Sequence, residues 1–89
     1  MSDTEFTEWD FAVLREMDRL REEGIDRIES ADLTPRIARR FPGNPEVAMR
    51  QGLSITRLRG RGLMDMHDDG TLGLTPEGVA LARGLEEEE

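Results

Sequence analysis

A four-residue turn, Pro42-Gly43-Asn44-Pro45, divides the middle of this chain and limits the folds available to it. Proline cannot continue an α-helix, and glycine favours backbone conformations that end one. Asn44 is a suitable N-cap for a helix whose first residue is Pro45. The turn therefore predicts two short helices, the first ending near Phe41 and the second covering about 45–60.

A longer helix is predicted before this turn, over about 8–23. Thr7 and Asp10 have the spacing of a capping box, in which a hydroxyl and a carboxylate accept hydrogen bonds from free amides at the helix start. Gly24 is placed to end the helix as its C′ residue. The apolar residues recur every three or four positions, as one helix face requires: Trp9, Val13, Met17 and Leu20.

The start of the second helix can be placed at two positions. Ser30 or Asp32 could cap an early start, whereas Thr34-Pro35 favours a later one because proline suits the first helical position. We place the start at Thr34-Pro35, which predicts a helix over about 34–41. Its inward face is expected to consist of Leu33, Ile37 and Phe41.

The apolar pattern changes from helical to alternating after Arg61. Asp69-Gly70 favours a type I′ hairpin turn between two short strands. Thr75-Pro76 then begins a short final helix. We therefore expect a mainly α fold with a small β-hairpin. The predicted organisation is a polar leader (1–6), one domain (7–85) and an acidic tail (86–89).

Length and composition fit one small domain. A chain of 89 residues buries only about 60–65% of its unfolded surface. Cysteine is absent, which excludes disulfides and cysteine-ligated metals. Apolar runs are no longer than four residues, too short for a signal sequence or a membrane span. We therefore expect a cytoplasmic protein with no membrane partner.

Charge is distributed unevenly along the chain. Residues 33–64 contain seven of the twelve arginines and one acid, Glu46, for a formal charge of +6, whereas the remainder carries −14. Lysine is absent and the net charge is −8. This acidic, lysine-free composition resembles that of proteins from halophilic archaea, although codon bias in a GC-rich genome also produces it. The basic segment makes nucleic acid a candidate partner.

One side of the helix predicted over 45–60 carries aligned cations. On a wheel of 100° per residue, four residues fall within about 60° of one another: Arg50, Ser54, Arg57 and Arg61. The opposite side is small and aliphatic, and consists of Ala48, Ile55 and Leu58, with Val47 at its margin. Such a helix fits a major groove about 12 Å wide, where guanidiniums reach phosphates or guanine edges. The alternative is a solvated arginine face.

The preceding helix adds three arginines that we expect to contact phosphates without reading sequence, as the first helix of a helix-turn-helix does. The alternative for any one of them is an ion pair with Glu46 or with a carboxylate of the first helix. The residues predicted to contact DNA are Arg36, Arg39, Arg40, Asn44, Arg50, Gln51, Ser54, Arg57 and Arg61.

Two motifs carry a resemblance to a known family. They are Ile55-x-x-Leu58-x-x-x-Gly62-Leu63 and the more specific Leu74-Thr75-Pro76-Glu77-Gly78. The chain resembles the winged-helix repressors over roughly residues 9–85, especially small single-domain ones from halophilic archaea and their phages. The resemblance implies a winged helix-turn-helix fold in which the helix at 45–60 is the recognition helix and residues 63–74 form the wing.

Three positions depart from that family pattern. Gln51 stands where the family usually has an aliphatic core residue. Leu53 stands where a DNA-contacting arginine is frequent, so either Leu53 touches a thymine methyl group or the helix is rotated. The predicted wing tip, His67-Asp68-Asp69, has no cation. We therefore expect the wing to contribute little to DNA binding.

These features predict a sequence-specific regulator of transcription that binds double-stranded DNA. A homodimer is expected because one short recognition helix reads few base pairs, and two half-sites give usable specificity. Phe6, Trp9 and the final helix are the expected contacts between subunits. The alternatives are a winged-helix module that binds protein without binding DNA, and an acidic protein that mimics DNA.

An enzyme is not expected. The chain has no cysteine, no tyrosine, no glycine-rich phosphate loop and one histidine, and the abundance of carboxylates on an acidic surface carries no information about acid–base catalysis. A metal site needs three or four convergent ligands, and His67 has only two neighbouring aspartates. No metal, cofactor or small-molecule ligand is therefore predicted.

Overall fold

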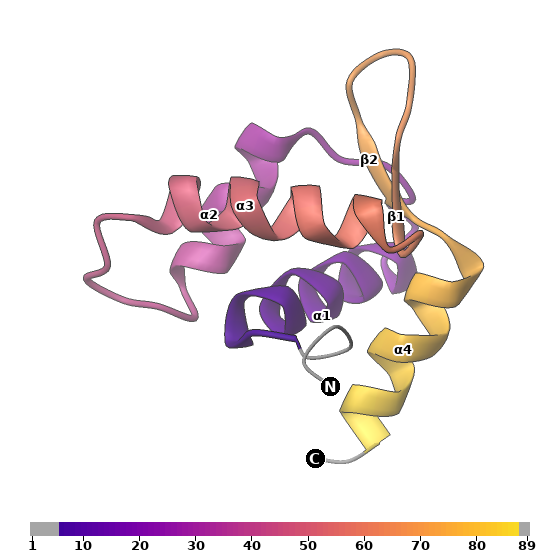
Figure 1. Cartoon of the computed structure of the whole chain (residues 1–89), viewed down its shortest axis with the longest axis horizontal. Coiled ribbons are helices and arrows are strands. Elements are labelled where there is room, and N and C mark those ends of the chain that lie inside the picture. The colour runs from indigo at the N-terminus through magenta and orange to yellow at the C-terminus, as the bar shows by residue number, and fades with distance from the viewer. Residues whose placement is uncertain (1–5, 88–89) are drawn as a thin grey trace.

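The computed structural model describes residues 6–87, with side chains described up to Leu85. Its elements are α1 (Glu8–Glu22), α2 (Ser30–Ala38), α3 (Val47–Gly60), β1 (Met64–Met66), β2 (Leu72–Leu74) and α4 (Pro76–Glu87). The expected mainly helical fold with a small antiparallel hairpin is confirmed. In Figure 1 the hairpin projects from the helical body, close to the end of α3.

Helix α1 is the central element, because it packs against α2, α3, α4 and β2. The predicted capping box is present: the Asp10 amide donates to the Thr7 hydroxyl, and the Thr7 amide donates to the Asp10 carboxylate. Gly24 (φ +92°) follows the helix, and the Ile25 amide donates back to the Leu20 carbonyl. This is the glycine-terminated helix end that the sequence predicts.

Helix α2 begins at Ser30, so the start predicted at Thr34-Pro35 is wrong. Pro35 lies inside the helix, where a proline costs about 3 kcal/mol. Burial of Leu33 and Ile37 contributes about 1.5–3 kcal/mol for each side chain. Tertiary packing therefore outweighs the local preference for a later start.

The turn between α2 and α3 is longer than predicted, because α2 ends at Ala38 and α3 begins at Val47. Asn44 does not cap α3. Its side-chain oxygen accepts the Glu46 amide at 2.8 Å and closes a turn before the helix begins. Gly43 (φ +79°) supplies the left-handed backbone of this turn. The predicted end of α3 is confirmed.

In the hairpin, β1 pairs antiparallel with β2. Ile28, which lies between α1 and α2, adds a single bridge to Leu72 of β2. The predicted type I′ turn is wrong, since it needs positive φ at both central residues and only Gly70 (φ +85°) has one in the described hairpin. A three-residue loop takes its place, closed by a hydrogen bond from the His67 amide to the Thr71 carbonyl.

Helix α4 is anchored to the end of α3 through Thr75 and Gly78. The Thr75 hydroxyl accepts the Gly78 amide and donates to the Gly62 carbonyl at 2.7 Å. A Cβ atom at position 78 would collide with the backbone oxygen of Leu63, so only glycine fits there. These contacts explain the threonine and the glycine of the Leu74–Gly78 motif.

Some residues of the predicted leader and tail belong to the described structure. Phe6, assigned to the leader, packs against the core, and its ring centre lies 5.8 Å from that of Phe11. Glu86 and Glu87, assigned to the tail, belong to α4. The remaining predicted leader (1–5) and tail (88–89) lie outside the described residues.

The hydrophobic core lies where α1 meets the other elements. Within the described residues, no helix has the length and apolar character needed to cross a membrane. The buried core residues are Ala12, Val13, Leu14, Met17, Leu20, Leu33, Ile37, Val47, Ile55, Leu58, Met64, Leu72 and Ala82.

Trp9 and Phe41 join α1 to the turn after α2. Their rings stack with centres 3.8 Å apart and an interplanar angle of 18°. Trp9, expected at a subunit contact, thus has an intrachain partner, as does Phe6.

Replacing Phe41 tests the importance of this stack. We expect Phe41→Ala to lower the free energy of unfolding by about 2 kcal/mol, because it removes both apolar packing and the ring contact. Phe41→Leu keeps the apolar bulk and should cost roughly half as much. Denaturant titration followed by Trp9 emission measures both effects. Unchanged emission and midpoint in the two variants would contradict the expectation.

Candidate nucleic-acid interface

Helix α3 is rotated relative to the face predicted to contact DNA. Its buried side consists of Val47, Gln51, Ser54, Ile55 and Leu58. Ala48, predicted to face the core, is exposed. On a helical wheel of 100° per residue, the centre of the exposed side of α3 lies about a third of a turn from the face predicted to contact DNA, which consists of Arg50, Ser54, Arg57 and Arg61.

Gln51 and Ser54 are not available to contact DNA, because their residues are only 1% and 0% exposed. The Gln51 amide donates to the Ser30 carbonyl at 3.0 Å and to the Ser30 hydroxyl at 3.1 Å, which ties α3 to the start of α2. The Ser54 hydroxyl donates to Asp10 of α1. The prediction that these two residues contact DNA is therefore wrong.

Arg57 binds a carboxylate within the protein. Its Nη2 atom lies 2.9 Å from Asp10 Oδ1 and 3.2 Å from Thr7 Oγ1. Burial raises the pKa of Asp10, but hydrogen bonds from Arg57, Ser54 and the Thr7 backbone outweigh burial and hold this pKa below its ordinary value. Arg57 therefore joins α3 to α1, while 39% of its side chain stays exposed.

Arg50 and Arg61 lie at the surface with weaker partners. Arg50 Nη2 lies 3.1 Å from Glu46 Oε1 in an exposed pair one turn apart, an arrangement worth about 0–1 kcal/mol. The Arg61 guanidinium lies 4.7 Å from the centre of the Phe6 ring, within cation–π range. Asn44 is exposed in the turn before α3.

Two of the three arginines near the end of α2 are paired with α1. Arg40 Nε lies 2.7 Å from Glu16, and Arg36 lies 3.9 Å from Glu16 and 3.6 Å from Glu23. For Arg36 and Arg40, the alternative of an ion pair with the first helix is thus confirmed. Arg39 is exposed and has no ion pair within the described part of the chain. All three line a cleft of about 360 Å³ against α1.

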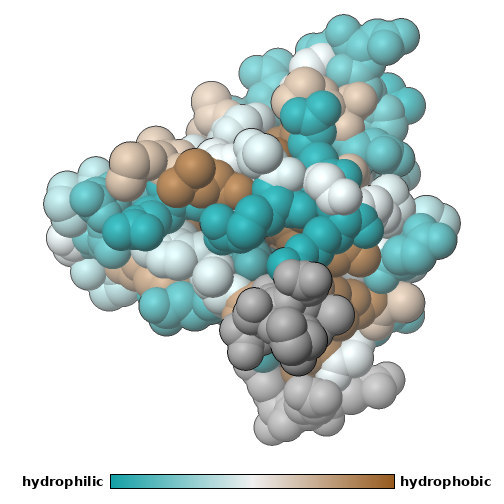
Figure 2. Space-filling model, in the orientation of Figure 1, coloured by the Kyte–Doolittle hydropathy of each residue, from teal (hydrophilic) through white to brown (hydrophobic). Residues whose placement is uncertain are grey.

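The exposed side of α3 is largely apolar. We call it the α3 outer face, and it consists of Met49, Gly52, Leu53, Thr56 and Arg59. Met49 and Leu53 are 53% and 50% exposed, and Figure 2 shows hydrophobic surface over the first half of α3. A cleft of about 440 Å³ separates the end of this face from β1.

Thr56 and Arg59 were not among the predicted residues. The resemblance to winged-helix repressors contained a signal that could have identified Thr56 and Arg59, because those proteins usually have an aliphatic core residue at the position of Gln51. With Gln51 in the core, the buried residues at 47, 51, 55 and 58 follow one helical stripe, and Thr56 and Arg59 turn outward. The polarity of Gln51 concealed this stripe.

The charge near α3 changes sign at the hairpin. Four arginines and no acid occur between Val47 and Met64, and Arg59 has no ion pair among residues 6–85. The hairpin carries Asp65, Asp68 and Asp69. Hydrogen bonds from the side chain and backbone of Thr71 hold the pKa of Asp69 below its ordinary value. A positive helix therefore borders an acidic hairpin.

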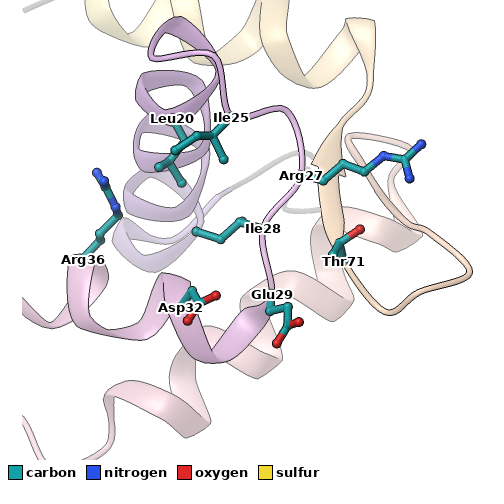
Figure 3. Close-up of a pocket in the computed structure, with 8 residues that line it drawn as sticks. All are labelled: Leu20, Ile25, Arg27, Ile28, Glu29, Asp32, Arg36 and Thr71. Atoms are coloured by element: carbon teal, nitrogen blue, oxygen red, sulfur yellow. The ribbon is translucent and has the colours of Figure 1, made fainter.

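A further cleft, of about 460 Å³, lies between the end of α1, the start of α2 and the hairpin (Figure 3). Two guanidiniums and two carboxylates line it, so their charges cancel. A polyanion would find no net attraction there, in contrast to α3. The lining residues are Leu20, Ile25, Arg27, Ile28, Glu29, Asp32, Arg36 and Thr71.

Comparison with protein-family models, characterised proteins and solved structures finds no match to this chain. A functional assignment must therefore rest on the geometry and charge of the α3 region.

Replacing Asp10 tests the link between α1 and α3. We expect Asp10→Asn to lower the free energy of unfolding at pH 7 by about 2 kcal/mol, because the charged hydrogen bonds to Arg57 are lost. The pKa of Asp10 is lower in the folded chain. Its stabilising contribution is therefore complete above the unfolded pKa of about 4 and is lost as the pH falls through the folded pKa.

Denaturant titrations at a series of pH values measure this difference. The gap between the wild-type chain and Asp10→Asn should be widest at neutral pH and should narrow below about pH 4. Asp26→Asn, which changes an exposed carboxylate, is the control and should have little effect. A gap that is constant across this pH range would rule out the proposed linkage.

Proposed function

We propose that this chain is a winged helix-turn-helix protein that binds duplex DNA through α3 and regulates transcription. The observation that carries the proposal is the stretch from Val47 to Met64, which has four arginines and no acid in a chain of net charge −8. Because acids are abundant elsewhere, their absence from a surface helix with three arginines, followed directly by a fourth at Arg61, favours a polyanionic partner.

The arrangement of elements supports this proposal. Helix α2, an eight-residue turn and α3 precede an antiparallel hairpin, and Ile28 bridges to β2. This order is compatible with a helix-turn-helix followed by a wing. Helix α3 has 14 residues, which corresponds to about 21 Å at 1.5 Å per residue. A helix of that size can enter a major groove about 12 Å wide.

The arginines of α3 have different roles in this proposal. Arg59 lies on the α3 outer face and is placed to reach base edges. Arg50 and Arg61 lie beside that face and contact phosphates. The exposed pair of Arg50 with Glu46 contributes only about 0–1 kcal/mol, so a phosphate can replace Glu46 at little cost. Arg57 keeps its contact with Asp10 and presents its exposed part to the DNA backbone.

Binding as a homodimer completes the proposal. One helix the length of α3 reads only a few base pairs, whereas two copies on adjacent half-sites give the specificity that a regulator needs. Arg39, which is exposed, is a further candidate for phosphate contact. Arg36 and Arg40 are assigned to structural pairs with α1.

The second candidate function is protein binding without DNA binding. Three exposed apolar side chains favour it, since Met49 and Leu53 on α3 and Met66 on the hairpin are each about half exposed. A protein surface with apolar and basic residues would complement this region. That function predicts no affinity for duplex DNA at any salt concentration.

Replacing Arg59 distinguishes these functions. We expect the wild-type chain to bind mixed-sequence duplexes, with affinity falling as salt rises from about 0.1 M to 1 M. Arg59→Gln should weaken binding and relax the preference at the base pair that Arg59 contacts, whereas Arg61→Gln, at a proposed phosphate contact, should reduce the slope of log K against log salt by about 1. Fluorescence anisotropy measures both quantities. The control is Arg27→Gln, an exposed arginine outside α3 that lines the charge-balanced cleft and should leave the slope unchanged. Equal slopes for Arg61→Gln and Arg27→Gln would contradict the proposal.

Gly52 offers a second test, which separates stability from binding. A Cβ atom at this position would meet nothing within 4 Å, and glycine inside a helix costs about 0.5–1 kcal/mol relative to alanine. Gly52→Ala should therefore raise the free energy of unfolding by that amount. Because the added methyl group lies on the α3 outer face, DNA affinity should fall. Denaturant titration measures the stability and fluorescence anisotropy measures the DNA affinity. An increase in both quantities would contradict this prediction.

A further inference from the structure

The α3 outer face has few groups that can form hydrogen bonds with base edges. Met49, Gly52 and Leu53 have no polar side-chain atoms other than a thioether sulfur. The Thr56 hydroxyl already donates to the Gly52 carbonyl at 3.1 Å. Arg59, at the end of the helix, is the one cation on this face. The first half of α3 can therefore form few hydrogen bonds with base edges.

Apolar contact is the other way to distinguish bases in the major groove. Thymine is the base that presents a methyl group there, at C5. Met49 and Leu53 lie one helical turn apart and are both about half exposed, so they form an apolar surface that can cover such methyl groups. We infer that Leu53 and Met49 select thymine by burying its C5 methyl group, an inference that rests on the proposed function.

Charge favours DNA over the other occupants of this surface. Arg50, Arg57 and Arg61 lie beside the α3 outer face, Arg59 lies on it, and no acid occurs from Val47 to Met64. Two copies that met through this face would bring like charges together, which is unfavourable. An apolar protein partner would have to cover the same arginines. A duplex, in contrast, supplies phosphates for the arginines and methyl groups for Leu53 and Met49.

The size of the expected effect follows from the exposed area. Burying the remaining half of a leucine side chain should change affinity by about fivefold, which corresponds to about 1 kcal/mol. Arg59 should act separately, through the O6 and N7 atoms of guanine. Loss of the thymine methyl groups should therefore weaken binding without abolishing it.

The test compares thymine with uracil, which pairs identically and lacks only the methyl group. The full chain is first used to select duplexes from a random-sequence pool at fixed salt. A selected duplex is then synthesised with 2′-deoxyuridine in place of every thymidine, and both forms are titrated by anisotropy. We expect the uracil duplex to bind about fivefold or more weakly. Leu53→Ala should bind with reduced affinity and a smaller preference for thymine, and the double variant Met49→Ala/Leu53→Ala should bind both forms equally.

The control and the possible outcomes keep this inference separate from the proposed function. Ile25→Ala removes another exposed apolar side chain, outside α3, and should keep the full thymine preference. Equal affinity of the wild-type chain for the two duplexes would overturn the thymine inference alone. Failure to select any duplex would overturn the proposed function. If no duplex were selected and Leu53→Ala abolished self-association in sedimentation experiments, the α3 outer face would be a contact between two copies of the chain.

Discussion

Two buried carboxylates on α1 hold the neighbouring segments in place, because each is paired with an arginine from a distant part of the chain. The pairs are Asp10 with Arg57 of α3, and Glu16 with Arg40, which follows α2. A third buried carboxylate, Asp18, binds Arg21 of α1 itself at 3.3 Å and lies 4.0 Å from Arg83 of α4. A charge removed from water costs several kcal/mol unless it is paired. Guanidinium suits this task, since its donors form a rigid fork that matches a carboxylate. Helix α1 therefore fixes the rotation of its neighbours as well as their distance.

The same pairs change the interpretation of the arginine-rich segment at 33–64. Arg36, Arg40 and Arg57 neutralise carboxylates of α1, so part of the +6 charge is used inside the protein. The positive charge that remains on the α3 side belongs mainly to Arg59, and to Arg50 and Arg61 with their weaker partners. A sequence charge map cannot separate these groups, because it does not show which cations have a buried acid opposite them.

Local signals were sufficient to predict much of the fold. The capping box of α1, its glycine-terminated end and the hairpin all depend on residues a few positions apart, and each is present. The rotation of α3 depends on distant partners instead: Asp10 lies 47 positions from Arg57, and Ser30 lies 21 positions from Gln51. A helical wheel gives the relative positions of side chains on α3, but only these distant contacts decide which side is buried.

The position of the hairpin relative to α3 is also fixed by backbone contacts. Thr75 binds the backbone of Gly62 and Leu63, and Gly78 packs against Leu63, so the hairpin cannot swing freely away from the end of α3. Asp65 therefore stays beside Thr56 and Arg59, across the cleft at the end of α3. In the proposed complex this carboxylate would repel phosphates close to Arg59, so Arg59 is better suited to contact base edges. Arg50, nine positions earlier and half a turn around the helix, lies on the side that is free of this repulsion and is better suited to contact phosphates.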